Sequence, residues 1–367
     1  KYMGKKEYKI EIDPRILELL GPNLYTNIYY VLAELIANAY DADAHNVYII
    51  SDEDSIRVED DGHGMSYKKG GIAKYLGVAK LSRTDENDSV TELGRKKMGR
   101  KGIGKLAALS VSENVDILTI SEGEKSGFVL SRHPNDDGLL QPINDMDIHF
   151  EKIDDHGTAI VMKNPEYRLH KTNAAIKRNI VNIFPLIDRD FRIHIINKDG
   201  KDDVIERMDD IFAKSLCTII TLGADYSTLA KKVNVPFADK KDTLVDVRPA
   251  YSEMLPLTNS HGENKEYQLV IEGWIGAYES TKGRKKDASD FPDNFISLYA
   301  NKKMGEFNIL PKVGKNRLIE SYIVGQLYVD LFELSELPDM ALSNRQGYKS
   351  DDSRYEKVIN YVGKVLL

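Results

Sequence analysis

The stretch KKMGRKGIGKLAALS, residues 96–110, carries three glycines among basic residues and has the composition of a phosphate-binding loop. From Gly99 the spacing G-x4-G-K is satisfied by Gly104 and Lys105, but Leu106 follows where the usual phosphate loop has Ser or Thr to bind magnesium. That loop also leaves a buried strand, whereas the polar run ELGRKK precedes this one. Backbone N–H groups at the start of the helix-like residues IGKLAALS could still hold an anion. A flexible basic loop is the alternative, and it is the commoner meaning of a lone glycine-rich match.

Three polar side chains upstream, Glu34, Asn38 and Asp41, stand at i, i+4 and i+7 and share one face of a predicted helix. A polar helix face is usually just solvated. Here, however, a predicted hairpin follows and ends in EDDGHGM, residues 59–65, where Asp60 begins a D-x-G-x-G pattern. Its glycines permit a turn in which the backbone approaches a ligand closely. Each motif is weak by itself, so their order and spacing are what point to a nucleotide site.

The order of these motifs resembles that of the GHKL ATPases, the superfamily of gyrase-type topoisomerases, ninety-kilodalton heat-shock chaperones, histidine kinases and MutL-type repair proteins. The resemblance covers about residues 25–165. ELIANAYDADA resembles the first nucleotide box, DDGHGM the second and GRKGIGKLA the third, and a G-T strand start follows at Gly157 and Thr158. It implies an α+β fold class, with a Bergerat-fold α/β sandwich ATPase domain, and the cofactors ATP and Mg²⁺. In these ATPases the phosphate loop takes no magnesium ligand from a following Ser or Thr, which accounts for Leu106.

The resemblance implies a role for each matched position in the first two boxes. The Asp60 carboxylate would accept a hydrogen bond from the adenine amino group, whereas guanine would present a carbonyl acceptor to it. Asn38 offers a neutral amide oxygen suited to Mg²⁺ and is the predicted metal ligand. Glu34, one helical turn earlier, would point at the γ-phosphate and orient or deprotonate the attacking water, so it is a predicted catalytic residue. Asp41 and Thr158 would hold adenine directly or through ordered water.

The remaining predicted nucleotide contacts come from the glycine turn, the third box and a lid. Gly62 and Gly64 shape the turn and Met65 lines the adenine pocket, while His63 occupies a variable position and is interpreted as structural. In the third box, backbone N–H groups and the helix start counter phosphate charge. The positions concerned are Gly99, Gly102, Ile103, Gly104 and Lys105. Lys80 would add charge from the lid, although a solvated surface position is an equal alternative for both Lys80 and Lys105.

Alternating helical and strand patterns must position these residues. The helix predicted over NLYTNIYYVLAELIANAYDA has an apolar stripe at Ile28, Leu32, Leu35, Ile36 and Ala39. NVYIIS and SIRVED, joined by the polar turn DEDS, predict a hairpin. Residues 66–98 are polar and weakly periodic, too long for a plain connection, and are predicted to form the lid. The pattern changes near residue 175, so we expect an ATP-binding domain at 1–175 and a second α/β domain at 176–367.

The second half mixes strands and helices in a way compatible with the β-α transducer domain that follows the ATPase domain in MutL, gyrase and the chaperones. DLFELSELPDMALSNRQGY, residues 330–348, resembles the chaperone segment whose arginine reaches the γ-phosphate from the second domain. On that resemblance Arg345 is the predicted phosphate sensor and second catalytic residue. One inserted residue separates Ser343 from Arg345 relative to the chaperone pattern, and a surface-loop arginine is an equal alternative. The chain begins without Met and stops inside a predicted helix, so we expect a fragment truncated at its C-terminus.

Composition excludes several classes of protein. A chain of 367 residues with 41% hydrophobic residues and a formal net charge of -7 suits a folded protein that is not broadly basic. No apolar run is long enough to span a bilayer and no signal peptide is recognisable, which predicts a cytoplasmic protein without a membrane partner. Cys217 lies in the apolar run SLCTIITL and is expected to pack in the core. The histidines show no metal-ligand spacing, so no structural zinc is expected.

These features together predict Mg-dependent ATP binding and slow hydrolysis in an ATP-gated switch, with lid closure, domain docking and ATP-dependent homodimerisation as the resemblance implies. The histidine-kinase branch is disfavoured because no H-box helix precedes the ATPase region and a long second domain follows it. The client is open between DNA, as for MutL or MORC proteins, and a protein, as for a chaperone. Lysines near 282–286 and 302–303 could make a local basic patch for DNA. A non-hydrolysing nucleotide-binding module is a further alternative, against which Glu34 argues because binding alone requires no carboxylate there.

Overall fold

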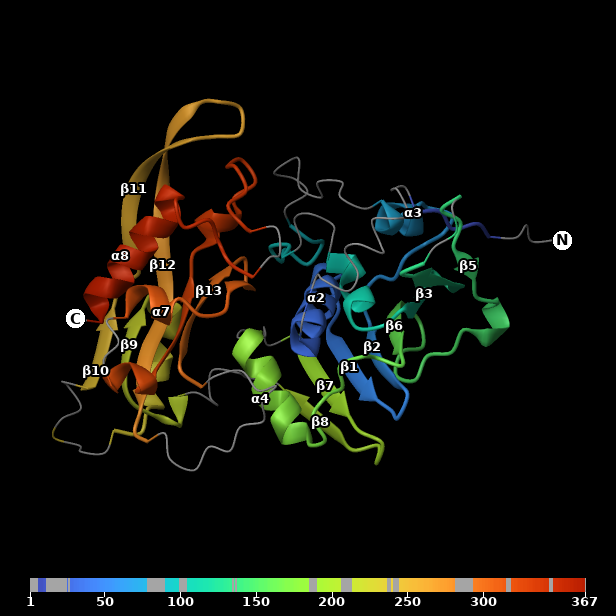
Figure 1. Cartoon of the computed structure of the whole chain (residues 1–367), viewed down its shortest axis with the longest axis horizontal. Helices are drawn as coiled ribbons and strands as arrows, with labels where there is room; N and C mark the ends of the chain where they lie inside the picture. The colour runs from blue at the N-terminus through green and yellow to red at the C-terminus, as the bar shows by residue number, and fades with distance from the viewer. Residues whose placement is uncertain are drawn as a thin grey trace. The chain divides into compact units, whose positions relative to one another are not determined.

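A computed structural model gives the fold of the chain (Figure 1). It describes residues 6–10, 25, 27–77, 90–98, 104–133, 135, 137–184, 190–205, 213–235, 239, 244–280, 293–314, 318–342 and 346–366. The chain divides into two compact units, one made of Lys1–Val181 and Ile187–Glu206, the other of Asn182–Leu186 and Arg207–Leu367. Each unit is built on its own β-sheet with helices beside it, which confirms the predicted mixed α and β fold class.

The first unit contains an eight-stranded sheet in the order β5-β4-β3-β6-β2-β1-β7-β8. Its strands are β1 (Asn46–Ser51), β2 (Ser55–Asp60), β3 (Asn114–Ser121), β4 (Glu124–Ser131), β5 (Gln141–Pro142), β6 (Gly157–Lys163), β7 (Arg192–Ile196) and β8 (Asp202–Ile205). Neighbouring strands pair antiparallel, except β1 and β7, which are parallel. The predicted hairpin is confirmed, since β1 and β2 pair across a turn closed by a 3.0 Å bond from Asp52 N to Ser55 O.

The predicted first helix is α2 (Ile28–Asp41), which begins where the side chain of Asn27 accepts a hydrogen bond from Tyr29 N at 2.9 Å. All five residues of the predicted apolar stripe are buried, which confirms that face of the helix as core. The stretch expected as a helix near 103–110 is a 3₁₀ helix, η3 (Gly104–Ser110), and it packs against α2. The unit also contains α3 (Gly71–Leu76), η4 (Asp145–Asp147) and most of α4 (Asn173–Ile183).

β7 and β8 extend the first sheet beyond the boundary expected at residue 175. β7 pairs with β1 in parallel, with Ile193 opposite Val47 and Ile195 opposite Ile49. These four side chains are all buried, so FRIHIIN fills the core of the first sheet and does not open a new domain. The first unit therefore continues to Glu206.

The second unit contains a sheet in the order β10-β9-β12-β15-β13-β14, with β11 paired to β12. Its strands are β9 (Leu216–Leu222), β10 (Val245–Arg248), β11 (Tyr251–Thr258), β12 (Asn264–Tyr278), β13 (Phe295–Ala300), β14 (Lys303–Glu306) and β15 (Ile323–Tyr328). Its helices are α7 (Leu310–Val313) and α8 (Ser353–Val365), with the 3₁₀ helices η5 (Ala224–Lys231), η7 (Leu318–Tyr322) and η8 (Asp330–Glu333). Cys217 is half-buried on β9.

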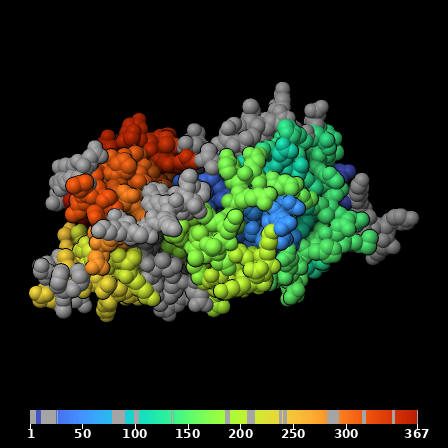
Figure 2. All heavy atoms as spheres, turned by 60° about the horizontal axis from the view of Figure 1, so that its bottom comes forward, coloured from blue at the N-terminus to red at the C-terminus, as the bar shows by residue number. Residues whose placement is uncertain are grey.

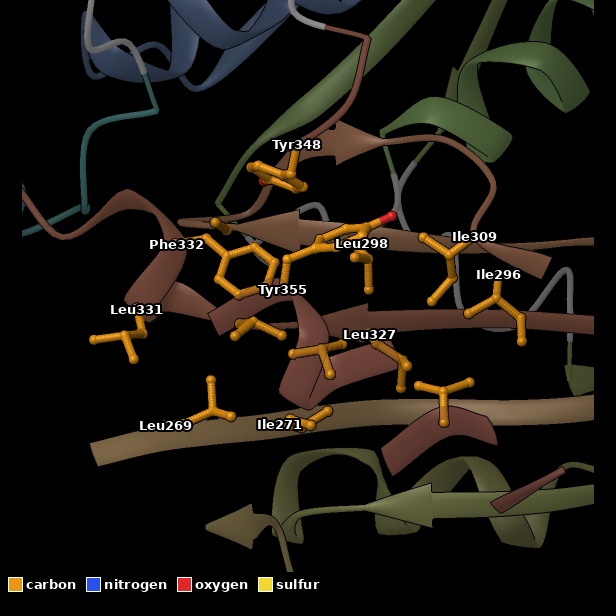
Figure 3. Close-up of a cluster of buried hydrophobic side chains, with 14 of the residues drawn as sticks. Leu269, Ile271, Ile296, Leu298, Ile309, Leu327, Leu331, Phe332, Tyr348 and Tyr355 are labelled. Carbon is orange, nitrogen blue, oxygen red and sulfur yellow. The ribbon is translucent and has the colours of Figure 1, made fainter. Parts of the chain in front are cut away.

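One buried cluster joins the helices of this unit to its sheet (Figure 3). Leu269 and Ile271 of β12 and Leu327 of β15 face Tyr355 of α8 and Phe332 of η8 across it. α8, the predicted terminal helix, begins at Ser353, directly after Asp352, whose carboxylate accepts a hydrogen bond from Arg354 N at 3.0 Å and caps the helix. Among the residues that the structure describes, no helix is both long and apolar enough to cross a membrane.

Candidate nucleotide site

Glu34 and Gly104 come from different motifs and meet where α2 packs against η3. Glu34 is buried, with 6% of its surface exposed. A β-carbon built on Gly104 would overlap the Oε2 atom of Glu34. Any residue larger than glycine would therefore displace the carboxylate. The first and third predicted boxes are adjacent in space.

Asn38 lies one turn after Glu34 on α2 and is half-buried. Its amide nitrogen Nδ2 is buried and has no hydrogen-bond partner among the described residues. A buried amide without a partner is costly unless a ligand or water satisfies it, and a turn of the amide would present Oδ1 at the same point. No group of three or more His, Cys, Asp or Glu side chains in the described part of the chain could hold a metal ion. The donor set fits a Mg²⁺ ion that takes one oxygen from Asn38 and the others from phosphate and water.

The glycine turn after β2 is attached to the end of α2. His63 N donates to Ala42 O at 3.0 Å, and Gly62 N donates to Asp60 Oδ1 at 3.0 Å. A β-carbon on Gly62 would lie 2.7 Å from Ala42 O and 2.8 Å from Asp60 Oδ1. Close packing against the helix end therefore requires glycine at position 62.

The other side of the turn is attached to β3 and β6. Gly64 has a φ of 66°, and a β-carbon on it would overlap Ile120 O. Thr119 Oγ1 accepts a hydrogen bond from Met65 N at 2.8 Å and donates one to Gly157 O at 3.0 Å. Sequence reasoning missed Thr119, and the available signal was a threonine inside the apolar strand VDILTIS.

Asp60, Thr158 and Thr119 form a row across three neighbouring strands. Thr158 on β6 is the register partner of Asp60 on β2 and of Thr119 on β3. Register partners of antiparallel strands point to the same face, so the second box and the G-T strand start share one surface. Burial raises the pKa of Asp60 to about 7, while the hydrogen bond from Gly62 N opposes this increase. A buried carboxyl group with a raised pKa is characteristic of functional sites.

Asp41 contacts the last described part of the predicted lid. Its Oδ1 accepts a hydrogen bond from Met98 N at 2.7 Å, and Asp43 Oδ2 accepts one from Leu93 N at 3.2 Å. Residues 90–98 are thus attached to the C-terminal end of α2. The predicted contact of Asp41 with adenine stays a prediction, because here its carboxylate binds the chain itself.

Arg95 is a further attachment of the same segment, and sequence reasoning missed it. The side chain is buried, and Nη1 donates to Ala44 O at 2.7 Å and Tyr40 O at 3.3 Å. The guanidinium carbon lies 4.5 Å from the centroid of the Tyr40 ring and 5.6 Å from that of Phe191. A cation at the carbonyl end of a helix and above aromatic rings is favourable on both counts. A single arginine in a polar run gives no sign of burial.

Lys105 contacts the end of α3. Its Nζ donates to Gly77 O at 2.8 Å, and the Tyr75 hydroxyl donates to Lys105 O at 3.2 Å. A role of Lys105 at phosphate stays a prediction. Five predicted site residues lie outside the described residues: Lys80, Gly99, Gly102, Ile103 and Arg345.

Comparison with known proteins adds independent findings. Residues 25–158 match the family model described as "Histidine kinase-, DNA gyrase B-, and HSP90-like ATPase". A Herpetosiphon aurantiacus protein named "Putative type II restriction enzyme HgiDII" is 25% identical over 366 residues, which cover 98% of this chain and 55% of that protein. Chaperone protein HtpG of Sulfurovum sp. (strain NBC37-1) is 26% identical over 183 residues, 44% of this chain and 28% of the chaperone. HtpG of Wigglesworthia glossinidia brevipalpis is 32% identical over 157 residues, 35% of this chain and 24% of that protein.

The matches cover different shares of this chain and of the matched proteins. The chain spans about half of the Herpetosiphon protein and about a quarter of each HtpG chaperone. The match to the Herpetosiphon protein extends over both units, whereas each HtpG match covers less than half of the chain.

Proposed function

Residues 25–158 form a GHKL-type ATPase domain, which implies ATP binding, and from this premise we propose that the protein is an ATP-driven conformational switch acting on DNA. The arrangement of Glu34 against Gly104 carries the hydrolytic part of the proposal. The buried carboxylate of Glu34 lies against Gly104, which is the first glycine of the third box among the described residues. A module that only bound nucleotide would gain nothing from a carboxylate there, because it repels phosphate charge.

Each residue of the proposed site has a distinct task. Asp60 accepts a hydrogen bond from the adenine amino group, and Thr158 lies beside it on the same face of the sheet. Asn38 supplies the protein oxygen for Mg²⁺, which when bound neutralises phosphate charge. Glu34 orients the attacking water and accepts its proton. The glycine-rich third box, of which Gly104 is the first described glycine, supplies backbone N–H groups to the phosphates.

DNA is favoured over a protein client by the extent of the matches. A protein named as a restriction enzyme matches both units, whereas the HtpG matches stop short of half the chain. The resemblance to HtpG supports a chaperone-like remodelling ATPase as the second candidate. It is the weaker one, because a shared ATPase domain would produce the same partial matches. Slow turnover, lid closure, docking of the second unit, an ATP-dependent homodimer and a cytoplasmic address are parts of the same proposal.

A pair of variants tests the proposal. Glu34→Gln should retain ATP with nearly parental affinity, measured by calorimetry with Mg²⁺, while phosphate release falls about 100-fold, the usual scale for losing a positioned base. The parental rate should also respond to added duplex DNA and remain unchanged with an unfolded client protein. Equal hydrolysis by Glu34→Gln and the parent would contradict the assigned base. Stimulation by the unfolded client alone would favour the chaperone candidate.

A further inference from the structure

A groove in the second unit lies between α8 and the strands β10 and β11 and encloses about 920 Å³. Four cationic side chains line it, Arg248, Lys312, Lys357 and Lys364, against one carboxylate, Glu253. Asp246 and Glu306 beside the groove each pair with one of these cations, which leaves a small local excess of positive charge in a chain whose net charge is -7. We propose that the groove binds the phosphodiester backbone of DNA, an inference that rests on the proposed function and assigns its DNA contact.

The periodicity of the two elements brings these side chains together. On α8, Lys357, Tyr361 and Lys364 stand at i, i+4 and i+7 and form one stripe along the helix. A different stripe, with Val358 and Val362, packs in the buried cluster under the helix. The stripe with the two lysines therefore faces away from the buried cluster and lines the groove. The C-terminal residues, drawn in red, lie at the molecular surface (Figure 2).

The groove is preformed. The rings of Tyr251 on β11 and Tyr361 on α8 stack with centroids 4.1 Å apart and an angle of 28° between their planes. The Tyr251 hydroxyl donates to Glu253 Oε2 at 2.8 Å. Lys312 Nζ donates to the hydroxyl of Tyr355, which is buried, at 2.7 Å. A ligand would therefore meet walls that are already ordered, which lowers the entropic cost of binding.

Ion pairs inside and beside the groove set the strength of the expected interaction. Lys357 pairs with Glu253 at 2.6 Å, Arg248 with Asp246 at 2.7 Å, and Lys312 with the buried Glu306 at 2.6 Å. The first two pairs are substantially exposed, and such pairs contribute little, so a phosphate can compete for Lys357 and Arg248. Lys312 stays with Glu306, because that carboxylate is buried and would lose its partner. The hydrogen bond from Lys357 and, to a smaller extent, the charge of Lys364 lower the pKa of Glu253, so Lys364 also interacts with this carboxylate. We therefore expect few phosphate contacts and modest, strongly salt-dependent binding.

The test uses the full chain and a fluorescently labelled DNA duplex, with binding followed by anisotropy over a series of salt concentrations. Lys357→Gln with Lys364→Gln should weaken binding about tenfold or more at low salt and reduce the slope of log affinity against log salt by about one to two. The matched control, Lys214→Gln with Lys231→Gln, removes the same charge from exposed positions of the same unit outside the groove and should bind like the parent. Both variants should bind ATP like the parent.

The outcomes separate the groove from the function on which it rests. If the parent binds DNA and the groove variant binds equally well, the groove is not the contact, although the proposed DNA function stands. If the parent binds no duplex at low salt with or without nucleotide, the DNA function and the groove both fail, while the ATPase proposal is judged by Glu34→Gln. If poly-glutamate binds the parent more tightly than the duplex does at the same salt concentration, and the groove variant loses this binding, the occupant is an acidic polypeptide and the inference is overturned.

Discussion

Gly104 lies directly behind the carboxylate of Glu34, so closely that a β-carbon at position 104 would overlap Glu34 Oε2. The contact joins two motifs that are far apart in the sequence. Glycine at this position is usually explained by backbone exposure to phosphate. Here it also leaves the space that the Glu34 carboxylate occupies, so in the proposed site one residue would serve both the phosphate and the attacking water.

Gly104→Ala should therefore act mainly on hydrolysis. The overlapping atom is the far end of a flexible side chain, so the protein can fold with the Glu34 carboxylate displaced. Because a displaced base no longer reaches the attacking water, we expect turnover to fall about 100-fold or more while Mg–ATP binding weakens far less. Steady-state phosphate release and calorimetry measure the two effects.

A double variant separates displacement of the base from damage to the phosphate loop. If Gly104→Ala acts through Glu34, the combination Glu34→Ala with Gly104→Ala should be no slower than Glu34→Ala alone, since residues acting as a unit are not additive. Rate losses that multiply in the double variant would show that the alanine acts independently of Glu34.

Asp60→Asn should have opposite effects on binding and stability. ATP affinity should fall by on the order of 1–3 kcal/mol, the cost of disrupting a hydrogen bond to a buried charged group. In the absence of nucleotide the variant should unfold at higher temperature than the parent at pH 8, because asparagine removes a charge that burial disfavours. An unchanged ATP affinity in the folded variant would exclude Asp60 from the site.

The stability gain should depend on pH in a defined direction. The folded-state pKa of Asp60 is about 7, above the ordinary value of 3.8, so the folded protein holds this proton over a range in which the unfolded chain has lost it. Ionisation of Asp60 therefore costs stability increasingly from about pH 4 to about pH 7, and fully above that range. Melting temperatures of parent and variant should converge near pH 4 and diverge up to pH 8; a constant difference would contradict the raised pKa.

Arg95 should stabilise the segment 90–98 more than any single surface contact. Arg95→Ala removes two hydrogen bonds to backbone carbonyls and a contact with the Tyr40 ring, and we expect a loss of about 2–4 kcal/mol in the free energy of unfolding. Proteolytic cleavage within residues 90–98 should be faster in the variant than in the parent. Lys96→Ala, on a neighbouring exposed residue, is the control and should melt like the parent.

Two substitutions of Asp41 distinguish an anchor for residues 90–98 from a contact with adenine. Asparagine keeps the side-chain oxygen that accepts the hydrogen bond from Met98 N, whereas alanine removes it. If Asp41 mainly anchors the lid, Asp41→Asn should keep ATP affinity and protease resistance, and Asp41→Ala should lose resistance at 90–98. A large loss of ATP affinity in Asp41→Asn would instead favour the predicted adenine contact.

The sequence predicted the parts of the site whose residue types are tied to chemistry and short-range geometry. The hairpin β1–β2, the buried stripe of α2 and the matched glycines all depend on local periodicity or turn chemistry, and these could be identified. The roles of Thr119 and Arg95 could not be predicted, because they depend on which strand or helix end lies opposite, and the local sequence pattern does not contain that information. The final strands of the first unit were assigned to the second half for the same reason, since the parallel pairing of β7 with β1 joins segments far apart in the chain.

Nucleotide should change hydrogen exchange in one part of the predicted lid and leave the segment attached to α2 unchanged. A γ-phosphate can favour a closed state only through contacts that it makes better there. Since residues 90–98 are already held by Asp41, Asp43 and Arg95, hydrogen exchange should show them protected with or without nucleotide. A non-hydrolysable ATP analogue with Mg²⁺ should add protection mainly in peptides from residues 66–89, and ADP should add less.

Arg345→Ala tests whether the second unit senses the γ-phosphate. The variant should bind nucleotide nearly as well as the parent, because the proposed adenine and Mg²⁺ contacts all belong to the first unit. It should nevertheless lose turnover and most of the difference in protection between the analogue and ADP. Identical protection of the parent by the analogue and by ADP would contradict the switch and indicate a site that only binds nucleotide. If the parent distinguishes them and Arg345→Ala does so equally well, the switch stands, and Lys302 and Lys303, which follow β13 in the second unit, are the next residues to replace.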